Sequence, residues 1–412
     1  ARPSPASQAA VGGPKGAAAN GEATGAGGAG GGPGPQRLWP GAEFFGASTQ
    51  EIVGHDSVVT CEDLIRQAGY PYEMIEVETE DGYILRLDRI PRRGARDVVL
   101  FQHGVLDSSQ GWVANGVLAS MAFAAYDRGL DVFLGNFRGV PPRKKREGNV
   151  GSSFWHYTGN EIGIFDVGAI VGEIHARKTA ELGAAEAAAS PGGKGAKRRG
   201  RAAAAGPPEG EPEPPYRLQA VAHSLGGLAL LVYITHMLQA DLPHRLQRMI
   251  LLTPAGYHHH GTPLIGYIFM LIDALPFGLL KGNRGLYLIH GFLRLFMHKL
   301  AKDLQSVPAL GQLSNGLCQF FFAKDASQWD RALLMPHFNM ESMPAFSVLT
   351  ASHLAQICAS RRFQLYDYGS AAANKEKYGL STPPDVAARY GLIDIPVDLV
   401  AGLGGGIIPP PN

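Results

Sequence analysis

The pattern of apolar and polar positions predicts a hairpin followed by alternating strands and helices. Residues 74–79 and 83–87 each alternate apolar and polar side chains around the turn sequence Asp81-Gly82, as expected of a β-hairpin. Apolar runs of strand length follow at 97–101, 131–134, 217–222, 248–252 and 396–400. Helical stretches lie between them at 115–128, 161–182 and 225–239. This order predicts an α/β fold with a mostly parallel sheet and helices on both faces.

Two segments cannot contribute to a hydrophobic core. Residues 1–36 and 184–214 consist mainly of Ala, Gly and Pro, with charged residues in the second segment and almost no large apolar side chains in either. Such composition predicts disorder. We therefore expect one folded domain over 37–412 that carries a disordered surface insert at 184–214.

The sequence Ala222-His223-Ser224-Leu225-Gly226-Gly227 stands between an expected strand and an expected helix. A serine on such a tight turn between strand and helix is typical of a nucleophile elbow, with small neighbours that avoid clashes. The Leu225 N–H, at the helix N-terminus, would point toward a developing oxyanion. We expect His223 to point away from the catalytic side and to support the turn. The alternative is an ordinary glycine-rich turn, because S-x-G-G is a common sequence.

A second motif follows an earlier strand. His103-Gly104-Val105 comes directly after the expected strand at 97–101 and Gln102, where hydrolases of this kind place their other oxyanion donor. The donor would be the Val105 N–H, and Gly104 would keep side chains away from the oxyanion. We expect His103 to be structural rather than catalytic.

A long apolar connection separates the expected strands at 248–252 and 396–400. Its run Leu264–Ile272 is short for a bilayer and is followed by Asp273 and Pro276, which argues against a membrane span. We expect a helical cap over about 257–345, lined by Leu, Ile and Phe. Such a cap would suit a long acyl chain and could rest on a lipid surface.

Composition narrows the possible partners. The net charge of +1 gives no argument for nucleic acid, and neither a phosphate loop nor metal-ligand spacing occurs, so we expect no cofactor and no metal. Basic runs at 143–146 and 197–199 are expected on solvated loops, with weak attraction to an anionic membrane as the alternative. Three dispersed cysteines and the lack of an N-x-S/T sequon favour an intracellular, reducing compartment, with association to a membrane or lipid surface left open.

Taken together, these motifs resemble the acid-lipase branch of the α/β-hydrolases, the gastric, lysosomal and steryl-ester lipases, and most of all the lipase-like hydrolases of plants. The resemblance covers about residues 69–401, apart from the insert. The blocks that carry it, in order, are Gly82–Leu85, Gln102–Ser109 with Trp112, Asp131–Gly139, Phe154-Trp155 with Asn160-Glu161 and Asp166, His223–Gly227, and His353–Gln356 with Tyr366–Ser370 and Asn374.

The resemblance implies an α/β-hydrolase fold and hydrolysis of lipid carboxylic esters, such as triacylglycerols or steryl esters. Ser224 would attack the ester carbonyl, a histidine would take its proton, and an aspartate would orient that histidine. The N–H groups of Val105 and Leu225 would hold the oxyanion.

The chain departs from the family pattern after residue 400. Gly405 stands where the family's aspartate is expected, and the sequence ends before the family's histidine, last strand and last helix. Losing these elements would expose apolar surface. His258, His259 and His260 offer a displaced base, or else an exposed polar loop. We expect Asp394 to cap a turn, and Asp398 either to point into the packing or to pair locally.

Three explanations follow from this departure. The chain is an incomplete form of an active lipid esterase, or a non-catalytic relative that binds a lipid or another partner, or a hydrolase with relocated acid and base.

Overall fold

The structure is a computed structural model that describes residues 60–146, 152–189, 214–256, 285–286, 344–403 and 408. The chain divides into two units, Ala1–Leu38 and Trp39–Asn412, and every described residue belongs to the second. The predicted disordered segment 1–36 therefore lies outside the described residues, as do most of the expected insert and nearly all of the expected cap.

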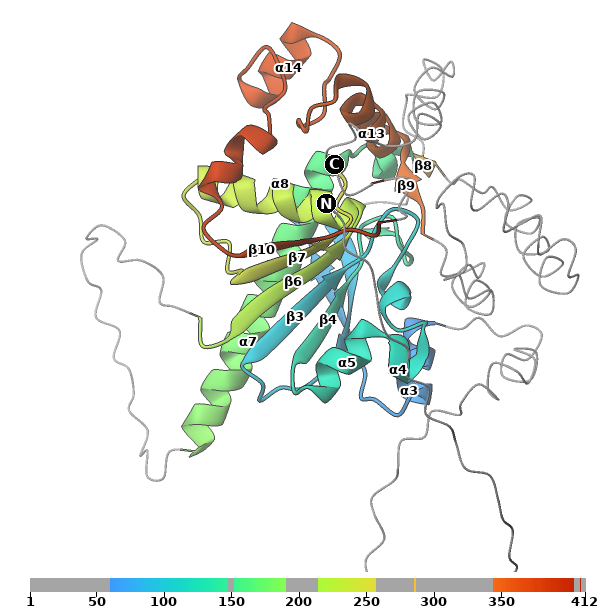
Figure 1. The fold of residues 1–412 in the computed structure, drawn as a ribbon, viewed down its shortest axis with the longest axis vertical. Coiled ribbons are helices and arrows are strands. Elements are labelled where there is room, and N and C mark those ends of the chain that lie inside the picture. Colours follow the sequence, from blue (N-terminus) through green and yellow to red (C-terminus); the bar gives the residue numbers. More distant parts are fainter. Residues whose placement is uncertain are drawn as a thin grey trace, which may run out of the picture. The chain divides into compact units, whose positions relative to one another are not determined.

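A mixed sheet organises the described residues (Figure 1). Its strand order is β1-β2-β4-β3-β6-β7-β10, and β5 pairs with β2 off this path. The hairpin strands β1 and β2 are antiparallel, β2 is antiparallel to β4, and β4, β3, β6, β7 and β10 run parallel to one another. The strands are β1 Glu73–Glu78, β2 Tyr83–Ile90, β3 Asp97–Gln102, β4 Asp131–Gly135, β5 Lys144–Lys145, β6 Arg217–His223, β7 Arg248–Leu252 and β10 Val397–Val400. The predicted, mostly parallel sheet is confirmed.

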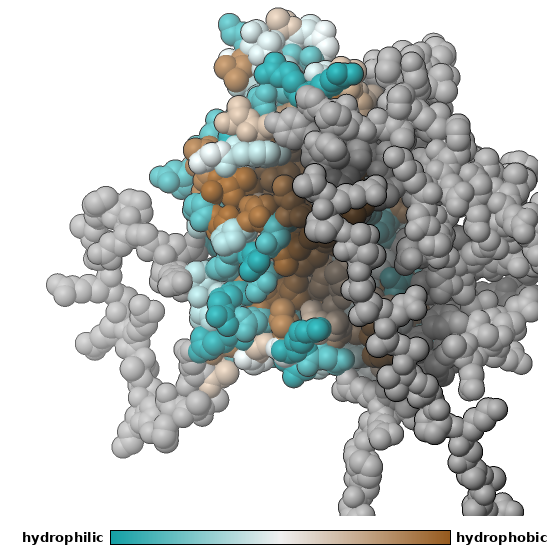
Figure 2. Space-filling model, in the orientation of Figure 1, coloured by the Kyte–Doolittle hydropathy of each residue, from teal (hydrophilic) through white to brown (hydrophobic). Residues whose placement is uncertain are grey.

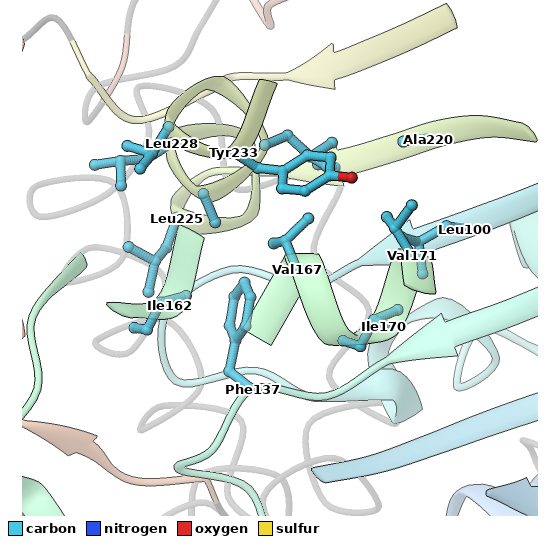
Figure 3. Close-up of a cluster of buried hydrophobic side chains, with 14 of the residues drawn as sticks. Leu100, Phe137, Ile162, Val167, Ile170, Val171, Ala220, Leu225, Leu228 and Tyr233 are labelled. Atoms are coloured by element: carbon cyan, nitrogen blue, oxygen red, sulfur yellow. The ribbon is translucent and has the colours of Figure 1, made fainter. Parts of the chain in front are cut away.

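Alternate side chains of each strand enter two separate cores. Leu100 and Ala220 face a cluster built with α7 (Gly168–Ala189) and α8 (Leu225–Gln239), whereas Phe101 and Val221 face a cluster built with α3 (Cys61–Gln67) and α5 (Met121–Asp127). This alternation follows from the two-residue period of a strand. Figure 3 shows the cluster that contains Leu100 and Ala220. In it, side chains of α8 meet those of residues 162–167, which directly precede α7.

Two predicted helices differ from the structure. The stretch 115–128 is divided into α4 (Gly116–Ala119) and α5 by Ser120, whose backbone is extended at φ −88° and ψ 125°. Ser120 stands at the N-cap of α5 without a side-chain capping hydrogen bond, so a serine cap does not explain the break. The stretch 161–182 starts with α6 (Gly159–Glu161), continues through a π-helical segment η3 (Ile162–Val167) and passes into α7. Helix α7 ends at Ala189, beyond the position 184 where the insert was expected to begin.

The other described elements are short turns, a second small sheet and two helices late in the chain. The 3₁₀ turns are η1 (Ser109–Trp112), η2 (Ser152–Trp155) and η4 (Ala387–Leu392). Strands β8 (Gly285–Leu286) and β9 (Phe346–Ser347) form a separate two-stranded sheet, and the helices are α13 (Val348–Ser360) and α14 (Ala371–Tyr378). Ser347 and Ser370 cap α13 and α14 through their hydroxyl groups, which accept from Leu349 N and Ala373 N, as N-cap serines commonly do.

A buried group of charges joins α7 to the sheet. Asp131 accepts hydrogen bonds from Arg89 at 2.6 Å and 2.9 Å and from Lys178 at 2.8 Å, and all three side chains are fully buried. Burial alone would raise the pKa of Asp131, but the hydrogen bonds and charges of Arg89 and Lys178 outweigh it and lower that pKa. The cluster therefore stays ionised and fixes α7 over the first strands.

The basic run at 143–146 lies partly on a strand, so its assignment to a loop was wrong. Lys144 and Lys145 form β5 against β2. Lys144 forms an ion pair with Glu76 at 2.5 Å, Arg146 pairs with Glu78, and the Lys145 ammonium lies 4.2 Å from the centre of the Tyr83 ring. These charges are partnered on the hairpin.

Apolar residues are exposed along β10 and just beyond it. Leu399 and Leu403 are 71% and 94% exposed, and Val400 is half exposed. Figure 2 shows apolar residues gathered over β6, β7 and β10. Within the described residues, no helix is long and apolar enough to span a membrane.

We expect Asp131→Ala to reduce the free energy of unfolding by about 3 kcal/mol, because it removes the fully buried carboxylate that Arg89 and Lys178 share. Both cations then keep only partly exposed partners, Glu181 for both and Glu73 for Arg89. The comparison is Asp97→Ala, which removes a solvent-exposed pair with Arg217 and should cost far less. Urea unfolding measures both. Equal losses in the two variants would show that the buried cluster contributes nothing special.

Because folding lowers the pKa of Asp131, the direction in which protein stability changes with pH can be predicted. Its contribution to stability is present above the unfolded pKa of about 4 and is lost as the pH falls through the lower, folded value. Urea midpoints measured between pH 6 and pH 3 should therefore fall more steeply for the wild type than for Asp131→Asn.

Candidate active site

Ser224 lies on a strained turn between β6 and α8. Its backbone has φ 50° and ψ −114°, a conformation that side-chain-bearing residues rarely adopt and that costs on the order of 1–3 kcal/mol. The Ser224 N–H donates to the Leu252 carbonyl at 3.1 Å, and the Ser224 carbonyl accepts from Gly227, Leu228 and Ala255 at 2.9–3.2 Å. These bonds hold the strained residue in place, so the predicted elbow has the backbone that an elbow requires.

Small residues after Ser224 let α8 approach the sheet. A Cβ on Gly226 would lie 2.6 Å from the Gln102 carbonyl oxygen and 2.7 Å from that of His103, and a Cβ on Gly227 would lie 2.6 Å from Pro254 Cβ. Backbone atoms of β3 and its following loop cannot give way easily. Gly226 therefore brings the first turn of α8 directly against the loop that carries His103 and Gly104.

The loop after β3 meets the elbow at Gly104. A Cβ at this position would lie 3.1 Å from Ser224 Cβ and 2.9 Å from His223 Nδ1, so only glycine fits without displacing them. Two residues later, the backbone of Leu106 also lies in the left-handed region, at φ 57°. Leu225 is the first residue of α8, and an N–H at that position has no acceptor within its own helix.

His103 is buried and holds two backbone groups. Its Nε2 accepts from the Phe137 N–H at 3.2 Å, and its Nδ1 lies 2.7 Å from the Gly104 carbonyl oxygen. The His103 ring also packs edge-on against Phe137, with ring centres 4.8 Å apart. Both ring nitrogens of His103 thus face backbone groups, Nε2 the loop after β4 and Nδ1 the Gly104 carbonyl.

The loop after β4 is anchored by a buried ion pair that sequence reasoning did not assign. Arg138 donates to Asp166 of η3 from its backbone N–H at 3.0 Å and from its guanidinium at 2.6 Å and 2.8 Å, and it also pairs with Asp81 at 2.7 Å. Burial alone would lower the pKa of Arg138, but Asp166 and Asp81 outweigh it and raise that pKa. The Arg138 guanidinium carbon also lies 3.8 Å from the centre of the Tyr83 ring.

His223 lines a cavity of about 210 Å³ beside the elbow, together with Asp107, Trp112, Met121 and others. Desolvation lowers the pKa of His223, and the nearby Asp107 carboxylate opposes this shift. The cavity adjoins the turn, because its wall also includes Leu252, whose carbonyl accepts from Ser224.

The candidates for a base and an acid divide into two groups. His258, His259 and His260 lie outside the described residues, and so does Gly405. Asp398 pairs with Arg248 at 2.6 Å, which agrees with the expected local pairing. Asp394 accepts from His244 at 3.0 Å and does not have the turn-capping role expected of it. His244 Nδ1 accepts from the Leu246 N–H, so its Nε2 carries the donated proton.

One further histidine lies near α8 without reaching a charged partner. His353 of α13 is buried and donates from Nε2 to the Gln364 carbonyl at 2.8 Å. Burial lowers the pKa of His353. A Cβ on Gly159 would lie 2.8 Å from its Nδ1 and 3.2 Å from the Leu228 side chain. His353 thus packs where α6, α8 and α13 meet. No group of three or more metal-ligating side chains occurs within the described ranges.

The fold agrees with what related sequences show. Residues 61–116 match the family model for the partial alpha/beta-hydrolase lipase region. This match and the mostly parallel sheet identify the fold class as that of the α/β-hydrolases, and residues 61–116 are similar to a lipase region of that class.

Several relatives carry the resemblance across most of the chain. Human gastric triacylglycerol lipase is 28% identical over 78% of this chain and 72% of its own length. Triacylglycerol lipase 1 of Arabidopsis thaliana is 26% identical over 88% and 81%, and the lysosomal acid lipase/cholesteryl ester hydrolase of Macaca fascicularis is 27% identical over 86% and 79%. Among solved structures, an esterase from Exiguobacterium antarcticum is 12% identical, matches 82% of this chain and 84% of its own, and has a TM-score of 0.39. The relatives confirm the resemblance to the acid-lipase branch.

We expect Gly226→Ala to destabilise the protein by about 1–3 kcal/mol, because the new methyl group meets two backbone carbonyl oxygens. The matched control is Gly172→Ala in α7, where nothing lies within 4 Å of the added Cβ. That change should stabilise by about 0.5–1 kcal/mol, since alanine is the better helix former. Thermal unfolding of both variants tests the close approach of α8, and equal effects would contradict it.

Proposed function

We propose that this protein hydrolyses carboxylic esters of lipids through an acyl-enzyme on Ser224. The single observation that carries the proposal is the strained backbone of Ser224 between β6 and α8, at φ 50° and ψ −114°. An ordinary strand–helix turn has no need of this conformation, whereas a nucleophile elbow uses it to present the hydroxyl group. The names of the relatives, triacylglycerol and cholesteryl ester lipases, support lipid esters as the substrate class.

In the proposed reaction, Ser224 Oγ forms a bond to the ester carbonyl carbon while its proton passes to a base. The tetrahedral oxyanion is held by the Val105 and Leu225 N–H groups, and each such donor contributes about 100-fold to 1000-fold in rate. The carbon–oxygen bond to the alcohol then breaks, and the alcohol leaves with the proton. Water repeats the sequence on the acyl-enzyme and releases the fatty acid.

Supporting roles in the proposal follow from close contacts. Gly104 leaves room beside Ser224 and His223, and Gly226 and Gly227 let α8 approach the sheet. The base and the orienting acid are assigned to none of the described residues, since no described histidine hydrogen-bonds the Ser224 hydroxyl. A displaced base among His258, His259 and His260 stays an alternative, beside that of an exposed polar loop.

Triacylglycerol and steryl ester both fit the proposal, because relatives named for each match this chain at similar identity. Contact of the region 257–345 with a lipid surface, and association with membranes, are part of the proposal. They rest on the apolar sequence of that region alone.

The direct test is labelling by a fluorophosphonate probe, which bonds to a serine only when a base activates it. We expect the wild-type chain to be labelled and Ser224→Ala to remain unlabelled. Ser109→Ala is the matched control: its hydroxyl is buried 2.6 Å from Asp88, so labelling should persist. Labelling that survives Ser224→Ala would place the nucleophile elsewhere and overturn the assignment.

The same experiment separates the alternative function, a non-catalytic protein that binds a lipid or a partner. If the wild type is not labelled but binds a fluorescent fatty ester in titrations, the binding function replaces hydrolysis. Labelling followed by release of free fatty acid from a triacylglycerol emulsion supports the enzyme.

A further inference from the structure

The contacts of His103 determine which of its ring nitrogens carries the proton. The Phe137 N–H points at Nε2 from 3.2 Å, so Nε2 must be the unprotonated acceptor. Neutral imidazole has one donor and one acceptor, and Nδ1 is therefore the donor. Its partner is the Gly104 carbonyl oxygen at 2.7 Å.

The Phe137 N–H is itself a fixed donor. The next residue, Arg138, is held through both its backbone N–H and its side chain by Asp166, and the Arg138 side chain is fully buried. The loop after β4 thus presents a rigid N–H to His103. This rigidity selects the ring tautomer with the proton on Nδ1.

The hydrogen bond from Nδ1 acts on one particular peptide group. The Gly104 carbonyl belongs to the same planar unit as the Val105 N–H, and in a trans peptide the two point in opposite directions. Holding the carbonyl against His103 therefore aims the Val105 N–H away from the His103 ring. A hydrogen bond to the carbonyl also polarises the N–H of the same unit, which strengthens it as a donor.

The peptide starts at the point where the loop touches the elbow. Gly104 Cα is so placed that a Cβ would lie 3.1 Å from Ser224 Cβ. On its other side, the backbone at Leu106 is held in the left-handed region at φ 57°. Without an additional restraint, a glycine-containing peptide between two such points could rotate and lose the direction of its N–H.

We propose that His103 is a positioning residue of the oxyanion hole, whose Nδ1–H fixes the 104–105 peptide so that the Val105 N–H serves the tetrahedral intermediate formed at Ser224. The inference rests on the proposed function and goes beyond it by assigning a mechanism to a histidine that does not touch the substrate. It also distinguishes the two contacts of the ring. The Nδ1 contact serves catalysis, and the Nε2 contact serves the attachment of the loop.

Two substitutions separate these contacts. In His103→Asn the amide nitrogen stands the same number of bonds from Cα as Nδ1, so the donor to Gly104 is kept and the acceptor for Phe137 is lost. In His103→Gln the amide oxygen can stand at the position of Nε2, so the acceptor is kept and the donor is lost. Both are buried polar replacements of similar character, and each is the control for the other.

We measure the rate of fluorophosphonate labelling of Ser224 as a function of probe concentration. His103→Gln should lower the maximal rate by about 10-fold to 100-fold, a part of the loss expected for removing an oxyanion donor, with the half-saturating concentration unchanged. His103→Asn should stay within about threefold of the wild type in rate, while its urea midpoint falls. Equal loss of rate in both variants, or a full rate in His103→Gln, overturns the proposal.

A second measurement keeps the test independent of activity. Long-range ¹H–¹⁵N spectra of histidine-labelled wild type should show the His103 signal protonated at Nδ1 and bare at Nε2. The Val105 amide resonance should shift in His103→Gln and stay near its wild-type position in His103→Asn. If the wild type is not labelled by the probe, the proposed function fails, and these spectra alone decide the role of His103. A wild-type His103 signal that is protonated at Nε2 would contradict the positioning role proposed for His103.

Discussion

The backbone of Ser224 is the constraint on which the rest of the site depends. A residue with a side chain at φ 50° and ψ −114° stores strain, and it persists only because surrounding groups determine it fully. Here the β7 carbonyl of Leu252 holds its N–H, while N–H groups from the first turn of α8 and from Ala255 hold its carbonyl. The sheet, the helix and the loop after β7 therefore all act on one residue. Gly226 completes the arrangement, since a larger residue would push α8 away and release the strain.

A second line of contacts reaches the same turn from the opposite side. It begins at the buried pair of Arg138 and Asp166, passes through the Phe137 N–H to His103, and ends at the Gly104 carbonyl. Each link joins segments that are distant in sequence. Because every group in this line is buried and partnered, the loop beside Ser224 is held without any contact to a substrate. Such a prearranged loop avoids reorganisation when charge develops in the reaction.

Much of this architecture was predictable, because it depends on local patterns. The alternating hairpin, the short apolar strands and the small residues around Ser224 each have a direct physical reason, and all five later strands and α8 lie where expected. The break at Ser120, the π-helical segment and the pairing of Asp394 with His244 were not predictable. They depend on which distant groups come together, and single-residue propensities are too weak to decide that. Likewise, the sequence identified His103 but gave no reason to connect its ring to one peptide group.

The π-helical segment η3 has a consequence for which changes in length this protein can accept. Each residue of an α-helix turns the chain by about 100°, and a π-helical segment contains an extra residue relative to a regular helix. Inside this segment, Gly163 packs so closely on α8 that a Cβ would lie 2.7 Å from Val232, and Asp166 faces Arg138. Beyond the segment, on α7, Lys178 faces Asp131. Deleting one residue would restore a regular helix but rotate one set of contacts away from its partners. Substitutions on the exposed side of α7 are therefore tolerable, whereas insertions and deletions before it are not.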